Sequence, residues 1–91
     1  MFEREHGLIR RMVRGKNYVL THHALDEMIA DDLHVQDIES IILKGSVTRR
    51  EKDQQTQEPK YVIFGLTTQG LDGEVVAKLK GNVVITTVYL L

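Results

Sequence analysis

The sequence predicts a single α+β domain over residues 1–91, in which two or three N-terminal helices pack on one face of a four- to five-stranded antiparallel sheet. Two observations predict this class. Apolar residues recur at helical spacing as far as Lys44, and from Ser46 onward they alternate with a period of two. The last stretch, Val83 to Leu91, is the strongest strand signal, because apolar and β-branched residues occupy both of its alternating faces.

The first half of the chain is predicted to form three helices, at Glu3–Arg14, roughly 22–32 and Val35–Lys44. Thr21 is a suitable N-cap for the second helix, since its hydroxyl can accept a hydrogen bond from a free backbone N–H. Gly15 and Gly45 are the expected C-caps of the first and third helices. Asp31 and Asp32 oppose the helix dipole, so the second helix is expected to end there.

The second half is predicted to form an antiparallel meander of strands at Ser46–Arg50, Lys60–Thr68, 74–80 and Val83–Leu91. The polar stretch from Glu51 to Pro59 is expected to be a mobile loop. The last strand would lie at an edge of this sheet, and the short extended segment Tyr18–Leu20 is the best candidate to pair with it.

Turn lengths decide which side chains face the helices, because a shift of one residue moves a strand's side chains to the other face. Gly81-Asn82 predicts a two-residue turn, and the pairs that follow include Lys78 with Ile85 and Glu74 with Tyr89. The face without helices would then carry a set of polar side chains: Glu74, Lys78, Lys80, Thr87 and Tyr89.

The predicted strand Lys60–Thr68 is assigned to its two faces in the same way. A four-residue turn over Gly70–Gly73 places Val62, Phe64 and Leu66 against the helices and leaves the alternate residues Tyr61, Ile63 and Thr67 outward, whereas a five-residue turn would invert this. The expected core joins Val62, Phe64, Val75, Leu79 and Val88 to Leu25, Met28, Ile38 and Ile42. On this assignment Phe64→Ala would cost roughly 3–5 kcal/mol.

The formal net charge of -1 is unevenly distributed along the chain. Residues 1–16 carry five basic and two acidic side chains, whereas residues 17–43 carry six acidic side chains and no Lys or Arg. Strong nucleic-acid binders are usually more basic than this. The arginines of the first helix are either an ordinary solvated face or an arm that binds phosphate or a partner.

Several kinds of site are not indicated by the sequence. The absence of Cys excludes disulfides and thiolate metal sites. The histidines lack the spacing of three or four residues that metal ligands on a helix need, and there is no glycine-rich phosphate loop. The start of the chain has no apolar core of a signal peptide, and no run approaches the roughly 20 apolar residues of a membrane span. We therefore expect a cytoplasmic protein with no cofactor, no metal and no membrane contact.

A resemblance to a known family rests on short motifs in this order and spacing: Thr21-His22-His23-Ala24 followed by Met28, Asp37-Ile38, Gly45, Pro59-Lys60-Tyr61 and Ile85-Thr86-Thr87-Val88-Tyr89. Over nearly the whole chain, these motifs resemble the small bacterial domain of unknown function 4258. That family is grouped with the RelE/ParE-like toxin fold, many of whose members are metal-independent ribonucleases of toxin–antitoxin pairs. The resemblance implies a RelE-like fold, with an antitoxin protein or RNA as the partner.

The same resemblance suggests site residues. The family's His-Ala histidine corresponds to His23, and its final-strand pair corresponds to Thr87 and Tyr89. Metal-independent cleavage of RNA needs a base for the ribose 2′-OH, cations for the phosphate and an acid for the leaving oxygen. Lys78 and Lys80 could supply the cations, with Tyr89 or His23 carrying protons. These five residues form the predicted catalytic site.

Two classes of function stay open at this point. The first is a toxin-like, metal-independent endoribonuclease that uses the decorated sheet face, where Glu74 could act as a base or simply neutralise Lys78. The second is a non-catalytic protein- or nucleic-acid-binding module that uses the same face or the basic first helix. Glu27 and Asp31 stand where arginines are common in the family, and this departure counts against RNA cleavage.

Overall fold

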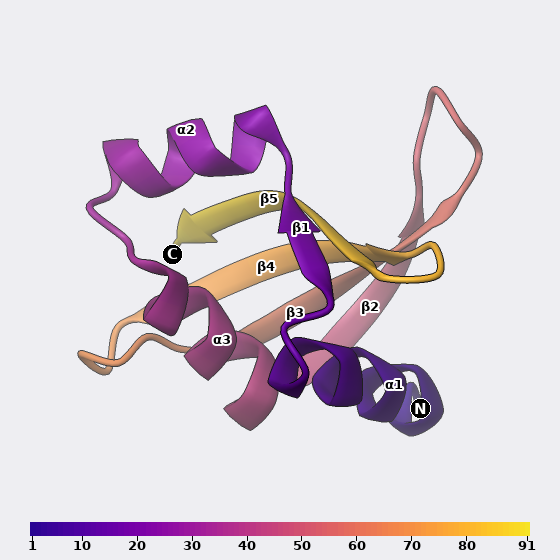
Figure 1. The fold of residues 1–91 in the computed structure, drawn as a ribbon, viewed down its shortest axis with the longest axis horizontal. Helices are drawn as coiled ribbons and strands as arrows, with labels where there is room; N and C mark the ends of the chain where they lie inside the picture. The colour runs from indigo at the N-terminus through magenta and orange to yellow at the C-terminus, as the bar shows by residue number, and fades with distance from the viewer.

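The computed structural model describes residues 1–91 and places three helices on one side of a five-stranded sheet (Figure 1). In chain order the elements are α1 (Glu3–Arg14), β1 (Tyr18–Leu20), α2 (His22–Ala30), α3 (Val35–Lys44), β2 (Ser46–Lys52), β3 (Pro59–Leu66), β4 (Asp72–Leu79) and β5 (Val83–Leu90). The strand order across the sheet is β1-β5-β4-β3-β2. The predicted α+β class, the three helices and the order of the meander are therefore confirmed.

The predicted capping residues mark the helix ends, with Gly15 and Gly45 as the C-caps of α1 and α3. Thr21 is the N-cap of α2, and its hydroxyl oxygen accepts a hydrogen bond from the backbone N–H of Ala24 at 3.1 Å. Asp37, in the first turn of α3, accepts the backbone N–H of His34 at 2.9 Å. The same carboxylate accepts the N–H and the hydroxyl of Thr68, at 3.0 and 2.6 Å. Asp37 therefore joins the start of α3 to the loop after β3.

The sheet is mixed, which corrects the prediction of an antiparallel sheet. Tyr18–Leu20 pairs with the last strand as predicted, but the two run parallel, with Tyr18 opposite Val83 and Leu20 opposite Ile85. No turn joins these two strands, because most of the chain separates them. Only a tight hairpin connection would have required the antiparallel direction.

The loop between β3 and β4 is longer than predicted. Leu66 pairs with Asp72, so five residues, 67–71, make the connection. The hydroxyl oxygen of Thr67 accepts hydrogen bonds from the N–H groups of Gln69 and Leu71, which closes the loop. The prediction of a four-residue turn is wrong. The Thr67 hydroxyl accepts backbone N–H groups of the loop, so a five-residue loop is closed without a tighter turn.

The longer loop inverts the faces of β3. Tyr61 and Ile63 belong to the core under the helices, whereas Val62, Phe64 and Leu66 lie on the other face. Val62 is buried there, Phe64 is half-buried and Leu66 is 49% exposed. The predicted core positions of Val62, Phe64 and Leu66 are therefore wrong, and a smaller cost is now expected for Phe64→Ala.

The connection from β4 to β5 also differs from the prediction. Leu79 pairs with Val83, so three residues, 80–82, form the turn and not two. Gly81 has φ +78, a left-handed conformation that glycine adopts without steric cost. As a result, Val83 and Ile85 face the helices in place of the predicted Val84 and Thr86.

A β-bulge then restores the predicted register. Ala77 pairs with Ile85 and Val76 pairs with Thr87, which leaves Thr86 as the extra residue of β5. Beyond the bulge the predicted pairs are confirmed, among them Glu74 with Tyr89. The bulge therefore offsets the extra residue of the turn.

The core lies between the helices and the sheet. It contains Ile9, Val13, Ala24, Met28, Leu33, Ile38, Ile41, Ile42, Tyr61, Ile63, Val75, Ala77, Val83, Ile85 and Val88. Gly65 lets α3 lie directly on β3, since a Cβ at this position would stand 2.6 Å from the carbonyl oxygen of Ile41. Met28, Ile38, Ile42, Val75 and Val88 are buried as predicted. Leu25 is 39% exposed, which corrects its predicted burial, and Leu79 is half-buried.

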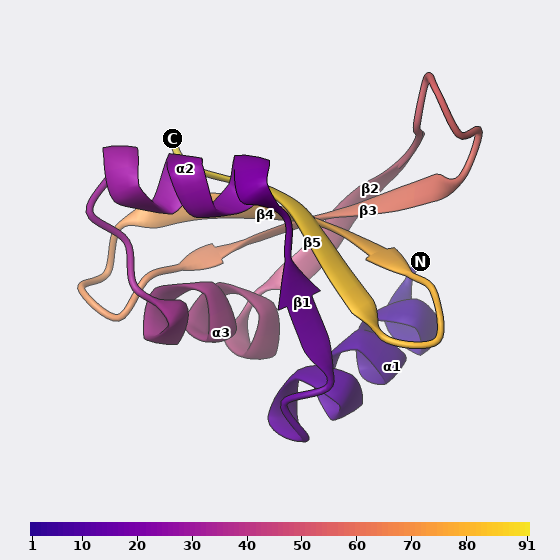
Figure 2. The same cartoon turned by 45° about the horizontal axis from the view of Figure 1, so that its top comes forward.

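Helix α2 lies along the part of β5 that β1 does not reach (Figures 1 and 2). The N–H of Val88 donates to the carboxylate of Glu27 at 2.8 Å, and the N–H of Leu90 donates to Asp31 at 3.5 Å. These acidic side chains take the place of a neighbouring strand. Glu27 and Asp31 therefore have a structural role at the sheet edge. They stand at positions where the family resemblance led us to look for arginines.

Strands β2 and β3 form a hairpin that projects from the domain (Figure 1). The polar stretch predicted as a loop from Glu51 to Pro59 is shorter, because β2 continues to Lys52 and β3 begins at Pro59. Asp53 organises the remaining tip, where its carboxylate accepts the N–H groups of Gln55 and Thr56.

Candidate functional site

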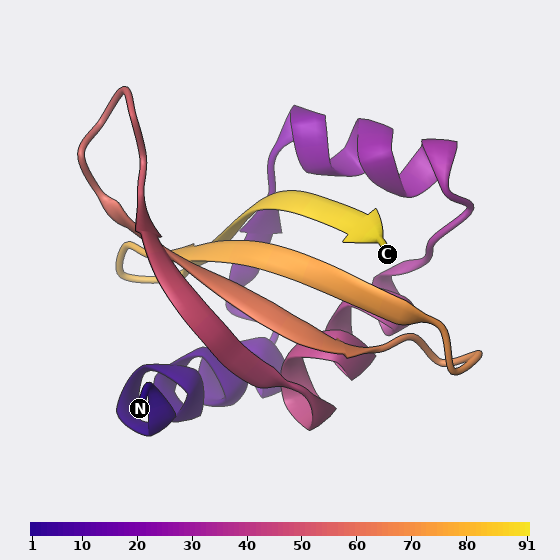
Figure 3. The ribbon, with the colours of Figure 1, turned by 180° about the vertical axis from the view of Figure 1, so that it is seen from behind.

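No helix covers the side of the sheet opposite α1, α2 and α3 (Figure 3). The pairing of β4 with β5 places most of the predicted site residues on this bare face. Strand alternation and the observed register place Glu74, Val76 and Lys78 of β4 on this face, beside Thr87 and Tyr89 of β5. Their polar groups fall into two clusters.

The first, which we call the tyrosine cluster, consists of Arg49, Glu51, Glu74 and Tyr89. The Tyr89 hydroxyl donates a short hydrogen bond to Oε1 of Glu74. Arg49 Nη1 lies 3.7 Å from Oε2 of Glu74, and Arg49 Nε donates to Glu51 at 2.8 Å. The hydrogen bond to Glu74 raises the pKa of Tyr89, and partial burial acts in the same direction. Tyr89 therefore keeps its proton at neutral pH and is a poor base.

Arg49 reaches this cluster because of a bulge in β2. The register shifts between Val47 and Arg49, so that Thr48 is the extra residue and Arg49 stands opposite Val62 on the bare face. Its side chain crosses β3 to approach Glu74 on β4. We did not predict Arg49 as a site residue. The sequence around it does not indicate the bulge, although the alternation of Arg49 and Glu51 fits an outward strand face.

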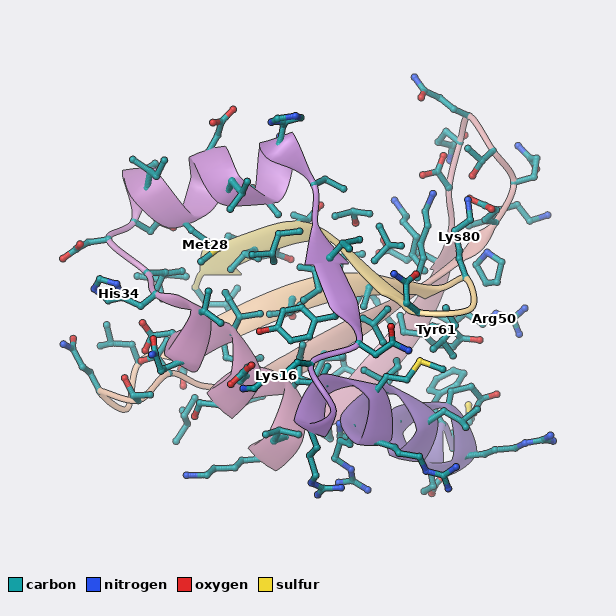
Figure 4. All side chains as sticks on the ribbon, in the orientation of Figure 1. Lys16, Met28, His34, Arg50, Tyr61 and Lys80 are labelled. Carbon is teal, nitrogen blue, oxygen red and sulfur yellow. The ribbon has the colours of Figure 1, made fainter.

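The second cluster, the hairpin cluster, consists of Lys78, Lys80, Asp53, Thr56 and Glu58. Lys78 Nζ lies 3.0 Å from both Asp53 and Glu58, and it approaches the Thr56 hydroxyl at 3.4 Å. Lys80 Nζ lies 2.9 Å from Glu58 and stands beside the hairpin in Figure 4. The tip of the β2–β3 hairpin thus closes over Lys78, which is only 8% exposed.

The protonation of the hairpin cluster follows from these contacts. Hydrogen bonds from Lys80 and Lys78 lower the pKa of Glu58 to about 2. The backbone N–H of Thr56, together with Lys78, lowers the pKa of Asp53. Asp53 and Glu58 in turn raise the pKa of Lys78. Asp53, Glu58 and Lys78 are therefore charged at neutral pH, and opposite charges in the cluster face one another.

The two clusters are too far apart to act on one phosphate. Glu74, the partner of Tyr89, is four residues from Lys78 along β4, a separation of about 13 Å at 3.3 Å per residue. Thr87 lies between them on β5 and is half-buried. The predicted grouping of Lys78 and Lys80 with Tyr89 around one phosphate is therefore not what the register produces.

His23 lies outside both clusters. It sits on α2, its side chain is 68% exposed, and its Nε2 lies 3.4 Å from Oε1 of Glu27. Glu27 faces the edge of β5, not the bare face of the sheet. Of the five predicted site residues, Lys78 and Lys80 are thus together, Thr87 and Tyr89 share a strand face, and His23 is separate.

Other concave or ligating features lie away from these clusters. The largest groove, of about 750 Å³, runs between the outer side of α3 and the end of β3, where Ser40 donates to the carbonyl oxygen of Leu66 at 2.8 Å. Nowhere in the chain do three or more His, Asp or Glu side chains converge as metal ligands would. No helix is both long enough and apolar enough to cross a membrane.

These features define a small α+β domain with three helices on one face of a mixed sheet and two clusters of paired charges on the other. The chain belongs to the family described as Domain of unknown function (DUF4258), whose model matches residues 20–90. The matched region starts at the last residue of β1, so that α1 precedes it. Comparison with curated proteins gives no match, and comparison with solved structures gives none either.

Proposed function

We propose that this chain is a non-catalytic protein-binding module with the RelE/ParE-like arrangement that its family resemblance implies. Its partner would be a protein, an antitoxin in that setting, that presents a lysine or arginine to the tyrosine cluster. One observation carries the proposal: each cation of the two clusters on the bare face already lies against a carboxylate.

The charge of each cluster supports a cationic ligand over a phosphate. In the tyrosine cluster, one guanidinium faces the carboxylates of Glu51 and Glu74, which leaves a formal charge of -1. In the hairpin cluster, two ammonium groups face two carboxylates and leave no net charge. An RNA phosphate would have to displace these carboxylates and would meet their repulsion, whereas a positive side chain would be attracted.

A second candidate, the metal-independent ribonuclease, is favoured by the composition of the tyrosine cluster. It brings together a carboxylate that could act as a base, a guanidinium that could contact phosphate and a phenol that could give up a proton. In this alternative Glu74 is the base, because the pKa of Tyr89 is raised and its hydroxyl donates to Glu74.

Measurements on purified protein separate the two candidates. Without added metal, we expect no cleavage of RNA and only weak, salt-sensitive RNA binding. A lysine- and arginine-rich peptide should bind more tightly than an RNA of equal charge, as measured by fluorescence anisotropy. Glu74→Gln should weaken peptide binding by about fivefold, the equivalent of roughly 1 kcal/mol. His23→Ala serves as the control and should leave the affinity unchanged.

The opposite result would support the ribonuclease. If the intact chain cleaves RNA and arrests growth on expression, and Glu74→Gln and Tyr89→Phe both abolish the cleavage, the binding-module proposal is wrong. Arg49→Lys adds a further distinction. It should impair cleavage that depends on a bidentate guanidinium, but it should leave the binding of a basic peptide nearly unchanged.

A further inference from the structure

Helix α1 carries an outward stripe of unpaired positive charge. Arg4, Leu8 and Arg11 follow at helical spacings of four and three residues, and this side of the helix is opposite the buried Ile9 and Val13. Arg4 and Arg11 are exposed and form no ion pair, and Leu8 is 36% exposed between them. We call these three residues the basic stripe.

Helix α2 and the residues that follow it carry the complementary pattern. Asp26, Ile29 and Asp32 are spaced three residues apart, all three are exposed, and Ile29 is 79% exposed. Neither aspartate forms an ion pair, in contrast to Glu27 and Asp31 of the same region, which accept N–H groups of β5. We call Asp26, Ile29 and Asp32 the acidic stripe.

The two stripes are complementary in charge, and each has an aliphatic residue between its two charged residues. Arg4 and Arg11 are about 10 Å apart along the axis of α1 at 1.5 Å per residue, and Asp32 lies just beyond the end of α2 in a left-handed conformation. The stripes cannot meet within one molecule, because α1 and α2 lie at opposite ends of the helix layer (Figures 1 and 2).

We infer that copies of this chain associate head to tail, with the basic stripe of one copy against the acidic stripe of the next. Ile29 would then pack near Leu8 between two pairs of opposite charges. An RNA could satisfy the arginines but would leave Ile29 in water. A different basic protein could cover α2 but would leave Arg4 and Arg11 unpaired. Copies of this chain cover both surfaces, one neighbour at the basic stripe and another at the acidic stripe.

The contact is expected to be weak and sensitive to salt. Two helices of 12 and nine residues bury an area at the low end of protein–protein interfaces, and the charges at the rim are exposed. Each contact uses different surfaces on the two copies, so an assembly of any length keeps one free stripe at each of its two ends. The average mass should therefore rise steadily with concentration and not stop at a dimer.

Sedimentation velocity of the full chain tests this inference. At about 0.02 M salt, the average mass should increase with protein concentration, and at about 0.5 M salt it should return to that of the monomer, since screening shortens the range of the charges. Arg4→Glu combined with Arg11→Glu should weaken association at least about tenfold. Asp26→Lys combined with Asp32→Asn should do the same. Asn is chosen at position 32 because Asp32 has φ +55, which Asn tolerates.

Mixing the two altered proteins gives the most specific result. Each variant alone carries two stripes of like sign and should be monomeric. Together they should associate at low salt. The unaltered basic stripe of the α2 variant meets the unaltered acidic stripe of the α1 variant, and the acidic α1 of the α1 variant faces the lysine introduced in α2 of the α2 variant. Arg50→Glu combined with Lys52→Glu is the matched control, with the same change of charge on the exposed β2 strand. It should leave association unchanged.

Other outcomes overturn the inference. They are a monomer at every salt and protein concentration, association that persists after the substitutions in α1, or a mixture that stays monomeric while both variants keep the circular dichroism spectrum of the parent chain. These results concern only the helix layer. They are distinguishable from a failure of the proposed function, which is measured on the bare face of the sheet.

Discussion

On the helix-covered face of the sheet, Ile63, Ile85 and Val88 are fully buried under α2 and α3, whereas on the bare face Lys78 and Tyr89 owe their positions to carboxylates. The same strands build both faces. Apolar packing stabilises in proportion to buried area and is not weakened by charge screening, while ion pairs near the surface contribute little and are screened. The covered face should therefore carry most of the stability of the domain, and the polar positions of the bare face should be freer to vary and to bind.

The largest expected difference is between neighbouring residues on opposite faces of β3. Ile63→Ala should lower the free energy of unfolding by about 2–5 kcal/mol, because Ile63 is fully buried in the core. Phe64→Ala should cost only about 1–2 kcal/mol, since Phe64 is half-buried on the bare face. Urea denaturation measures both. Equal costs for the two substitutions would contradict the observed inversion of β3.

An intermediate effect is expected at Asp37, the polar joint between α3 and the loop after β3. Asp37→Ala should lower the free energy of unfolding by about 1–3 kcal/mol, since it leaves the N–H groups of His34 and Thr68 without their acceptor. Asp37→Asn keeps one carbonyl oxygen and is the matched control, with a smaller loss. If Asp37→Ala melts at the same temperature as the parent chain, the joint contributes nothing.

The smallest effect is expected on the bare face, and it should depend on pH. The pKa of Glu58 is lowered to about 2 from its ordinary value of 4.5, so its contacts with Lys78 and Lys80 stabilise the hairpin fully above about pH 4.5. This contribution is lost as the pH falls from about 4.5 to 2. The protection of the amides of residues 53–58 against exchange, relative to the intrinsic rate at each pH, should fall over that range, while the amides of α3 stay protected.

Glu58→Gln tests the cause of that acid effect. It should give faster exchange in the hairpin at neutral pH and a weaker dependence on pH, while Asp53 continues to titrate. The range from about pH 5 to 2 spans the two pKa values of Glu58. If the protection of the parent hairpin does not change over this range, after correction for the intrinsic rate of exchange, the ion pairs do not hold the hairpin.

The difference between the faces also explains what could be predicted from the sequence. The helices were predictable because their apolar spacing and caps are local: Thr21, Gly15 and Gly45 mark their ends. The face of β3 was not, since Tyr61 to Leu66 is apolar at both alternate positions apart from Gly65, and only the loop closed by Thr67 decides between them.

The candidate site was predictable only in part, for the same reason. Tyr89 opposite Glu74 was predicted correctly only because the bulge at Thr86 offsets the extra residue of the β4–β5 turn. Arg49 reaches them through a second bulge that no sequence signal marks. The partners of Lys78 lie on the tip of the β2–β3 hairpin. Glu58 is 20 positions away along the chain, and Asp53 is farther still. Ion pairs of this kind depend on how far β2 and β3 extend, which a polar stretch does not reveal.

The carboxylates of Glu27 and Asp31, which accept N–H groups of β5, affect how the protein behaves at high concentration. An uncovered strand offers its N–H and C=O groups as a template, and identical chains can stack on such a template into amyloid fibrils. β5 is the segment with the composition for it: eight residues, Val83–Leu90, with neither charge nor proline. While Glu27 and Asp31 occupy its outer N–H groups, a fibril cannot start there. Detaching α2 from the sheet is therefore the step that would open β5 to aggregation.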